Sequence, residues 1–550
     1  MSRAWIVVVA AGLLLAGHAA GAHAQCVGDC DGDRTVTVSD LVRGVNIALG
    51  TAALAECPNF DCNGAGEVTV DCIVKGVSAA LNGCPSNVPN PTVEGPITTG
   101  AGVPFIAGTS FDLSQVGYTQ AEYFVAGTAA AYVNVGPLTD DGRWTVEPAG
   151  RAAYRTRIVV YRPIEASDFN GTVVVEWTNV SGGVDAAPDW IMGHTELIRS
   201  GYAYVAVSAQ AVGIEGGPAL LGIVSLPLKM QDPVRYGVLS HPGDSFSYDI
   251  YSQAAQAVRH PVGIRPLGDL NIQAMLAFGE SQSAFRMVNY INAVHPIADL
   301  FDGFFVHSRG SFGAPLSEPP QPSISVNGAV PIRSDTNVPT LTLETETDLT
   351  LLGFYAARQP DSENFRLWEV AGTAHADTYT ITGMTDLGDS PDAAKLLITA
   401  SPLPGIIDCP SPINSGPQHF VQKAAIAALN RWVREGIAPP SAPRLEAMAG
   451  PPVTFAVDEH GNARGGIRTP QVDVPIARFT GDSGAASIVC RIFGGTEPFD
   501  DAKLAALYPD HDAYVSAVNE ATDRAVDAGY ILPPDAALIK AAAEESDIGG

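Results

Sequence analysis

The sequence predicts an α/β protein with a mostly parallel sheet, preceded by a small helical module that disulfides hold together. Residues 150–400 alternate short apolar runs with stretches of helical periodicity, which is the pattern of parallel strands covered by helices. Six of the eight cysteines lie between residues 26 and 84. A chain of 550 residues is long enough to form both parts.

The apolar runs of the larger part define the strands that we expect in the sheet. Helical periodicity separates several of them and is clearest at 248–258, 285–294 and 421–435. The last of these helices opens a C-terminal segment that we expect to pack as a cap or belt. The expected strands are 157–161, 171–177, 202–208, 272–278, 303–307, 338–343 and 365–370.

The charge of the chain excludes two classes of partner. Lys and Arg number 31 against 59 Asp and Glu, which gives a net charge of −28. A surface of this sign repels nucleic acid and anionic membranes, so neither is expected to bind. The apolar content of 46% with 16% charged residues is typical of a globular protein.

The first 24 residues have the pattern of a secretory signal peptide. A basic start at residues 1–3 precedes an apolar run over 4–16 and an A-x-A sequence at 22–24, so we expect cleavage before Gln25. A membrane anchor fits less well because the run is short, and no later segment holds about 18 consecutive apolar residues. We therefore expect a secreted protein, extracellular or periplasmic, without membrane insertion.

Export makes the cysteines candidates for disulfides. The six cysteines near the N-terminus are expected to stabilise a module too small to be stable by its core alone, in a connectivity that the sequence leaves open. Cys409 and Cys490 are the remaining two, and we expect them to pair with each other.

An internal repeat runs through the cysteine-rich segment, because residues 29–46 and 61–77 carry the same pattern 32 positions apart. The first copy places oxygen-bearing side chains at loop positions 1, 3, 5, 9 and 12, as a hard cation such as Ca²⁺ requires. These candidate ligands are Asp29, Asp31, Asp33, Thr37 and Asp40.

The repeat resembles a dockerin-type pair of EF-hand-like loops, in which Asp ends the loop and one helix follows it. The sequence departs from that pattern at Arg34, where Gly is usual, and at Ala65 and Cys72, which replace two ligands of the second copy. We therefore expect Ca²⁺ at the first loop only. The resemblance implies a cohesin-like partner, with a cell-surface module or a disulfide-held hairpin with vestigial loops as alternatives.

A segment rich in Pro, Asn and Gly, residues 86–98, is expected to be a linker. The predicted organisation is thus a signal peptide over 1–24, a dockerin-like calcium-binding module over 25–85, the linker, and a larger domain over 99–550.

The candidate nucleophile of the larger domain is Ser281. It lies in Gly279-Glu280-Ser281-Gln282-Ser283, between an expected strand and an expected helix. A serine on such a turn has the geometry of a nucleophile elbow, although Ser283 stands where the usual signature has Gly. The alternative is an ordinary polar turn. Glu280 is expected to orient the elbow or to bind a neighbouring donor rather than to act as the acid.

A nucleophilic serine needs a histidine base, and the histidine needs an acid. The sequence offers both in the order Ser, acid, His. Acids at 344, 346 and 348 follow one expected strand, and His375 follows the next. Asp348 is our candidate acid because of its place in the turn 345–348, and Glu346 is the second choice.

Donors for an oxyanion are the remaining part of such a site. The N–H of Gln282 follows the nucleophile, and the glycine-containing loop 177–183 offers Asn179 and Val180. A plain turn is the alternative for that loop. The stretch 213–233, rich in Gly, Pro and Leu, is a candidate loop on the substrate side.

Four segments, 174–183, 278–284, 344–348 and 368–375, together resemble a little-characterised bacterial α/β-hydrolase-domain family over roughly residues 100–540. The resemblance implies the α/β-hydrolase fold, a serine mechanism through an acyl-enzyme, and membership among carboxylic ester hydrolases without a catalytic cofactor. The resemblance does not imply a substrate. Export together with the N-terminal module suggests an extracellular ester, in a polyester or an acylated polysaccharide. The alternatives are a non-catalytic scaffold or adhesion protein with a relic hydrolase fold, and a metal hydrolase, for which no H-E-x-x-H motif is present.

Overall fold

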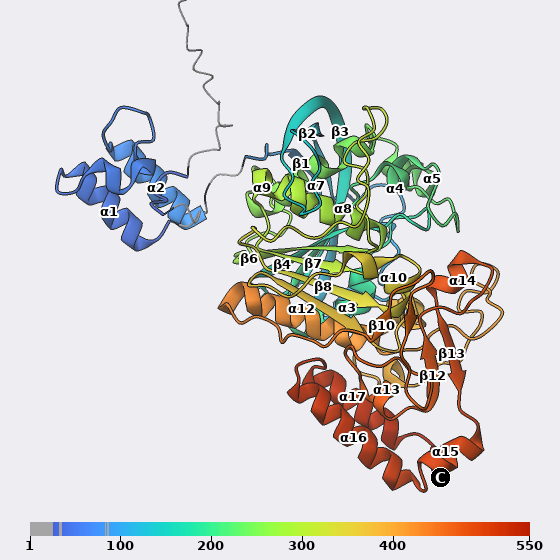
Figure 1. Cartoon of the computed structure of the whole chain (residues 1–550). Helices are drawn as coiled ribbons and strands as arrows, with labels where there is room; N and C mark the ends of the chain where they lie inside the picture. The colour runs from blue at the N-terminus through green and yellow to red at the C-terminus, as the bar shows by residue number, and fades with distance from the viewer. Residues whose placement is uncertain (1–25, 32–35, 83, 85–86) are drawn as a thin grey trace, which may run out of the picture. The chain divides into compact units, whose positions relative to one another are not determined.

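The chain divides into two compact units, Met1–Asn87 and Val88–Gly550, which we call unit 1 and unit 2 and describe separately (Figure 1). The expected signal peptide with its cleavage site, and the candidate ligand Asp33, lie outside the residues that the structure describes. No helix of the described residues is long and apolar enough to cross a membrane. The computed structural model describes residues 26–31, 36–82, 84 and 87–550.

Unit 1 is built on two helices that close over one aromatic ring. Helices α1 (Val38–Ala48) and α2 (Val70–Asn82) both pack on Phe60, which is fully buried. A Cβ at Gly44 or Gly76 would come within 2.4 or 2.6 Å of that ring, so both helices need glycine there. The two glycines lie 32 residues apart and are equivalent positions of the sequence repeat.

Disulfides hold unit 1 together in a connectivity that the sequence left open. The pairs are Cys26–Cys84, Cys30–Cys57 and Cys62–Cys72. In unit 2, Cys409 pairs with Cys490, so that prediction is confirmed. Disulfides of this number are typical of an oxidising compartment.

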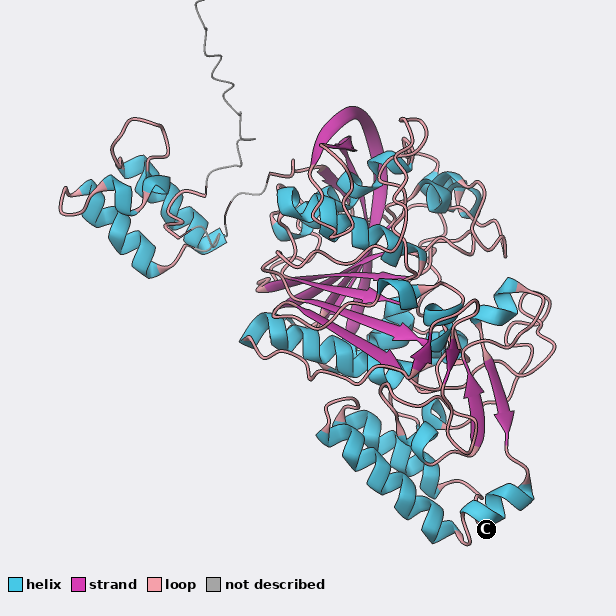
Figure 2. Ribbon diagram, in the orientation of Figure 1, coloured by secondary structure: helices cyan, strands magenta, loops and turns pink. Residues whose placement is uncertain are grey.

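The described residues of unit 2 form a nine-stranded sheet in the order β1-β2-β3-β5-β4-β6-β7-β8-β9 (Figure 2). The six strands from β5 to β9 run parallel, and the first three form an antiparallel edge. The strands are β1 (Thr92–Glu94), β2 (Tyr118–Asn134), β3 (Val146–Pro163), β4 (Thr172–Trp177), β5 (Ala203–Val207), β6 (Ala274–Glu280), β7 (Gly303–His307), β8 (Thr340–Thr345) and β9 (Phe365–Val370).

The mostly parallel sheet is therefore confirmed, and the antiparallel edge is what the sequence analysis missed. All seven expected strands are present, but β2 was not expected and β3 is far longer than 157–161. Strand β1 lies inside the expected linker, where it pairs with β2. The linker prediction is thus wrong over 92–94. The composition of a short segment does not indicate whether it pairs with the edge strand of a sheet.

Helices cover both faces of the sheet (Figures 1 and 2). Helices α7 (Ser247–Arg259) and α8 (Gln282–Asn289) pack on one face, and α3 (Pro188–Arg199) and α12 (Gln418–Glu435) pack on the other. Successive side chains of a strand point to opposite faces of the sheet, so alternate residues of each strand belong to the apolar core on one face and on the other. Shorter helices are α4 (Ala211–Glu215), α5 (Leu228–Gln231), α6 (Pro233–Tyr236), α9 (His295–Ala298), α10 (Glu346–Thr350) and α11 (Tyr379–Thr382).

The C-terminal segment, expected as a cap or belt, forms a small helical layer with its own apolar core. Asp535 joins this layer to the main body through Arg199 of α3, at 2.6 Å, and Lys423 of α12, at 3.3 Å. Its elements are β10 (Ala447–Met448), β11 (Thr454–Phe455), α13 (Pro470–Asp473), β12 (Ala477–Thr480), α14 (Ile488–Ile492), β13 (Gly495–Pro498), α15 (Asp501–Leu507), α16 (His511–Asp527) and α17 (Pro533–Glu544).

We predict that Cys409→Ala with Cys490→Ala lowers the free energy of unfolding of unit 2 by about 2–4 kcal/mol, because the bond closes a long loop in the unfolded chain. The two cysteines are separated by 81 residues. Urea denaturation followed by tryptophan fluorescence measures this, since every tryptophan after Trp5 lies in unit 2. The matched control, Cys62→Ala with Cys72→Ala, should leave that transition unchanged. An equal effect of the two double variants would contradict the prediction.

Candidate active site

Ser281 sits on a strained turn between β6 and α8. Its backbone has φ 55° and ψ −118°, in the region of positive φ that non-glycine residues rarely adopt. Its N–H donates to the carbonyl of His307 on β7, at 2.9 Å, which anchors the turn to the sheet. The side chain is therefore presented at the carboxyl end of the parallel strands, where α/β proteins bind their ligands.

Small neighbours make this turn possible. A Cβ at Gly279 would lie 3.0 Å from the carbonyl oxygen of Ser283, so β6 and α8 could not approach as closely with a larger residue. Ser283 takes the place of the usual glycine, and its hydroxyl donates to the carbonyl of Glu280 at 2.7 Å. The departure from the usual signature therefore adds a hydrogen bond inside the turn.

Three sequence-predicted side chains meet at this edge of the sheet. Ser281 Oγ lies 2.8 Å from Nε2 of His375, and Nδ1 of His375 lies 2.6 Å from Oδ1 of Asp348. The serine follows β6, the acid follows β8, and the histidine follows β9. With the histidine proton on Nδ1, the ring donates to the carboxylate and accepts from the serine hydroxyl.

Asp348 is held for this contact by a helix cap. The N–H and the hydroxyl of Thr345 both donate to Oδ2 of Asp348, each at 2.7 Å, in the capping box of α10. These bonds leave Oδ1 for His375. The hydroxyl of Thr347 accepts the N–H of His375 at 3.0 Å, so the same short helix also positions the histidine loop.

Glu346, the second choice for the acid, points to other partners. Its carboxylate accepts the N–H groups of Gly372, at 2.7 Å, and Gly481, at 3.0 Å. Burial raises the pKa of Glu346 to about 7. This side chain joins the histidine loop to the C-terminal layer, and of the two candidate acids only Asp348 contacts His375.

A second carboxylate, that of Glu280, lies on the other side of the histidine ring. Its Oε1 is 3.5 Å from Nε2 of His375, and its Oε2 accepts from the side-chain amide of Asn179 at 2.8 Å. Burial raises the pKa of Glu280 to about 7. Burial lowers the pKa of His375, but the charges of Asp348 and Glu280 outweigh it, so the pKa is raised overall.

The candidate oxyanion donors differ in their availability. Gln282 is the first residue of α8, so its N–H has no acceptor within the helix. The N–H of Asn179 already donates to the carbonyl of Ala186 at 2.8 Å, and its side chain is bound to Glu280. Asn179 therefore supports the elbow, and Val180 and Gln282 are the two donors that fit the expected role.

The stretch 213–233, the candidate loop on the substrate side, lies against the loop 177–183. Backbone N–H groups of Leu221, Val224 and Leu226 donate to the carbonyls of residues 181, 182 and 183 in turn. A Cβ on Gly183 would come within 2.0 Å of the carbonyl oxygen of Val224, so glycine is required there for the close approach.

Comparison with known proteins agrees with this architecture. Residues 93–541 match the sequence profile of the alpha/beta hydrolase domain family. The chain belongs to the α/β-hydrolase domain family. No curated protein matches the sequence.

Solved structures of a serine hydrolase and of esterases are similar at a low level. XC6422 of Xanthomonas campestris, a serine hydrolase without a lid, is 12% identical over 44% of this chain and 83% of its own, with a TM-score of 0.25. The glucuronoyl esterase of Solibacter usitatus is 10% identical over 52% and 82%, with a TM-score of 0.26. Esterase Est22 is 14% identical over 49% and 78%, with a TM-score of 0.25. These values add nothing to the family match.

An apolar cluster beside this α/β-hydrolase site was missed by the sequence analysis. It includes Ala376, next to the histidine, and it packs with Leu221 of the stretch 213–233 and with Leu351, which follows α10. Its other members come from chain segments with no shared periodicity, so no pattern in the sequence connects them. They are Ile381, Leu403, Ile407, Cys409, Ile413, Val489, Ile492 and Phe493.

The candidate calcium ligands in unit 1 are only partly described. Thr37 and Asp40 form the capping box of α1, in which the Thr37 hydroxyl donates to Asp40 at 2.6 Å. Asp29 is buried and Asp31 is exposed. Within 26–31, 36–82 and 84, no three acidic, histidine or cysteine side chains gather as a metal group would require. With Asp33 outside these ranges, calcium binding stays a prediction.

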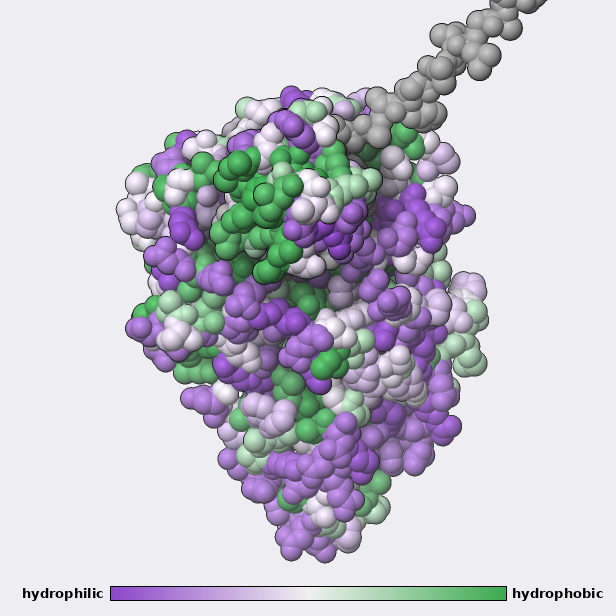
Figure 3. Space-filling model, turned by 90° about the vertical axis from the view of Figure 1, so that its left-hand side faces the viewer, coloured by the Kyte–Doolittle hydropathy of each residue, from purple (hydrophilic) through white to green (hydrophobic). Residues whose placement is uncertain are grey.

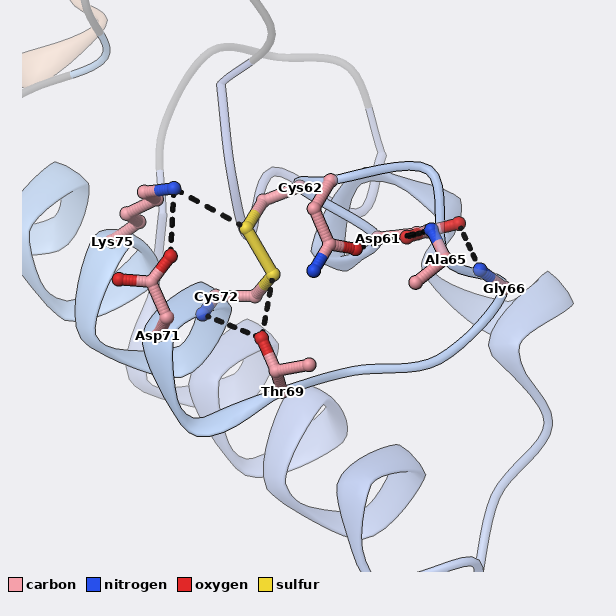
Figure 4. The surroundings of a disulfide bond; sticks show 9 residues. Asp61, Cys62, Ala65, Gly66, Thr69, Asp71, Cys72 and Lys75 are labelled. Atoms are coloured by element: carbon pink, nitrogen blue, oxygen red, sulfur yellow. Dashed lines mark hydrogen bonds and ion pairs between the residues drawn. A yellow bond between two sulfur atoms is a disulfide. The ribbon is translucent and has the colours of Figure 1, made fainter.

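The second loop is shaped by its own hydrogen bonds (Figure 4). The carboxylate of Asp61 accepts the N–H groups of Ala65 and Gly66, both at 2.9 Å. Cys72, at the last ligand position, is bonded to Cys62. A disulfide thus replaces a ligand at the point where the first loop has Asp40.

We predict that Glu280→Gln lowers the pKa of His375, because it removes a negative charge that favours the protonated ring. NMR titration of the histidine ring with labelled histidine measures this. The matched control is Asp377→Asn: burial also raises the pKa of Asp377 to about 7, but its carboxyl is bonded to Thr380. The control should leave the His375 pKa unchanged. An unchanged or higher pKa in Glu280→Gln would contradict the prediction.

Proposed function

We propose that this α/β hydrolase cleaves carboxylic esters through a covalent acyl-enzyme. The observation that supports this most strongly is the contact of His375 with Ser281 on one ring nitrogen and with Asp348 on the other. A serine activated in this way, on a strained turn beside backbone N–H donors, has the parts that acyl transfer requires.

In the proposed reaction, Ser281 Oγ attacks the ester carbonyl while Nε2 of His375 accepts its proton. The N–H groups of Gln282 and Val180 stabilise the oxyanion of the tetrahedral intermediate. His375 then gives the proton to the leaving alcohol, and a water molecule repeats the sequence to release the acid. Asp348 remains ionised and holds the imidazole in the working tautomer. Because the base must be neutral, hydrolysis is lost as the pH falls through the raised pKa of His375.

The proposed substrate is an extracellular ester, in a polyester or an acylated polysaccharide. The signal-peptide pattern of residues 1–24 and the four disulfides of the described residues support an extracellular or periplasmic location. Ala376, which follows His375, and Leu221 belong to one apolar cluster, and this supports a substrate with an apolar part near the histidine. Labelling of the purified protein by a fluorophosphonate probe, with peptide mapping to Ser281, is the direct test of the nucleophile.

We predict that Ser281→Ala abolishes the hydrolysis of a short activated ester such as p-nitrophenyl butyrate. His375→Ala should be about as damaging, because the members of such a unit act together and their losses do not add. Asp348→Asn should reduce kcat by roughly a thousandfold or more through the wrong histidine tautomer. Steady-state kinetics with each purified variant gives these values.

Glu346→Gln is the control for the choice of acid. It should lower the melting temperature, because one amide group cannot accept both backbone N–H groups, and it should reduce kcat less than Asp348→Asn. If Glu346→Gln is the more damaging of the two, the assignment of Asp348 is wrong. Full turnover in Ser281→Ala would refute Ser281 as the nucleophile, and an absence of ester hydrolysis by the native chain would favour the non-catalytic scaffold.

We also propose that unit 1 binds Ca²⁺ at its first loop only. Oxygen side chains occupy five ligand positions there, whereas the second loop has Ala65 and a disulfide-bonded Cys72 at two of them. Asp29→Ala with Asp40→Ala should abolish the single site seen by calorimetry on the full chain. The control, Asp61→Ala with Asn63→Ala, should leave it unchanged. Two equivalent sites would contradict this.

A further inference from the structure

Each helix of unit 1 exposes a row of four large aliphatic side chains. All eight are between 39 and 80% exposed. We call the two rows together the aliphatic face. Its residues are Val38, Val42, Val45 and Leu49 along α1 and its C-cap, and Val70, Val74, Val77 and Leu81 along α2.

The spacing within each row is that of a helix-packing seam. Successive members are four, three and four residues apart, which is the spacing of alternating d and a positions in a heptad. Each residue of the α1 row also lies 32 positions before its counterpart on α2. The repeat thus duplicates an outward face as well as the inward glycines that pack on Phe60.

The aliphatic face is larger than a monomeric surface usually tolerates. Figure 3 shows a continuous hydrophobic area on unit 1. The eight side chains expose on the order of 800 Å², which exceeds the largest apolar patch of a typical monomer and equals what one partner contributes to a standard interface. Such a face is therefore expected to be covered by a partner in solution.

A lipid surface does not match the charge of unit 1. Between residues 26 and 87, acidic residues outnumber basic ones by eight to three. Helices that lie on membranes carry Lys and Arg on their polar face to bind anionic lipids. Over its described residues, unit 1, in which acidic residues are in excess, lacks such a set of Lys and Arg side chains beside the aliphatic face.

A second copy of the same face matches better. The two rows are equivalent, so a two-fold axis can place α1 of one copy against α2 of the other with apolar side chains on both sides. The positions that flank the rows are mostly uncharged, so two copies would not bring many like charges together. These positions are Ser39, Asn46 and Ala48 on α1, and Asp71, Ser78 and Ala80 on α2.

We propose that the aliphatic face pairs with the aliphatic face of a second copy, so that two units 1 form a four-helix bundle and the protein is a dimer. Three disulfides close unit 1 of each copy before the copies meet, and both helices already pack on Phe60, which reduces the ordering cost of association. The catalytic residues proposed above all lie in unit 2, so this inference is independent of the proposed reaction.

Sedimentation velocity of the full chain over about 1–50 μM tests the proposal. The native chain should sediment as a dimer, and Val42→Glu with Val74→Glu should sediment as a monomer. The matched control is Val262→Glu, whose side chain is 65% exposed on unit 2, and it should remain a dimer. Thiol titration should find no free cysteine in any variant, which checks that unit 1 is still folded. Ester hydrolysis per chain should be the same in all three.

Three outcomes would overturn the proposal. The first is a native chain that remains a monomer over the whole concentration range. The second is a dimer that persists both in Val42→Glu with Val74→Glu and in the control Val262→Glu. The third is a monomer that binds phosphatidylcholine vesicles through the aliphatic face, shown by flotation of the native chain and not of the double variant.

Discussion

The backbone conformation of Ser281 is the constraint on which the candidate site depends. A non-glycine residue at positive φ costs on the order of 1–3 kcal/mol and persists only where its surroundings leave no alternative. Here those surroundings are the N–H bond to His307, the absence of a side chain at Gly279, and the hydroxyl of Ser283 inside the turn. Once the turn is held, the serine hydroxyl can only be presented toward the strand end at which the histidine and acid loops begin.

The buried carboxyl groups around this turn differ in role according to the groups that donate hydrogen bonds to them. Asp348 accepts from a helix cap and from His375, Glu346 accepts from two backbone N–H groups, and Glu280 accepts from Asn179. Residue type and proximity in the sequence do not separate these roles. The partners do, because each buried carboxylate needs donors of its own, and those donors fix the direction in which it points.

Unit 1 shows how one repeat can produce two different results. The inward glycines and the outward aliphatic rows are duplicated faithfully, because both depend on helix periodicity alone. The loops have diverged, because each ligand position acts separately. At Cys72 a disulfide now closes the second loop. The packing role of the repeat is therefore kept in both copies, and the ligand set is complete in the sequence of only one.

The sequence by itself determined the strands of the parallel sheet, the elbow around Ser281, the histidine and the short list of acids. These features depend on local patterns: apolar runs, small residues at a turn, and polar residues directly after strands. Only the tertiary structure decided that Asp348 rather than Glu346 meets His375, that the N–H of Asn179 is already bonded, that β1 and β2 extend the sheet, and which cysteines pair in unit 1. The physical reason is that these outcomes depend on contacts between segments far apart in the chain, and no local pattern of residues specifies such contacts.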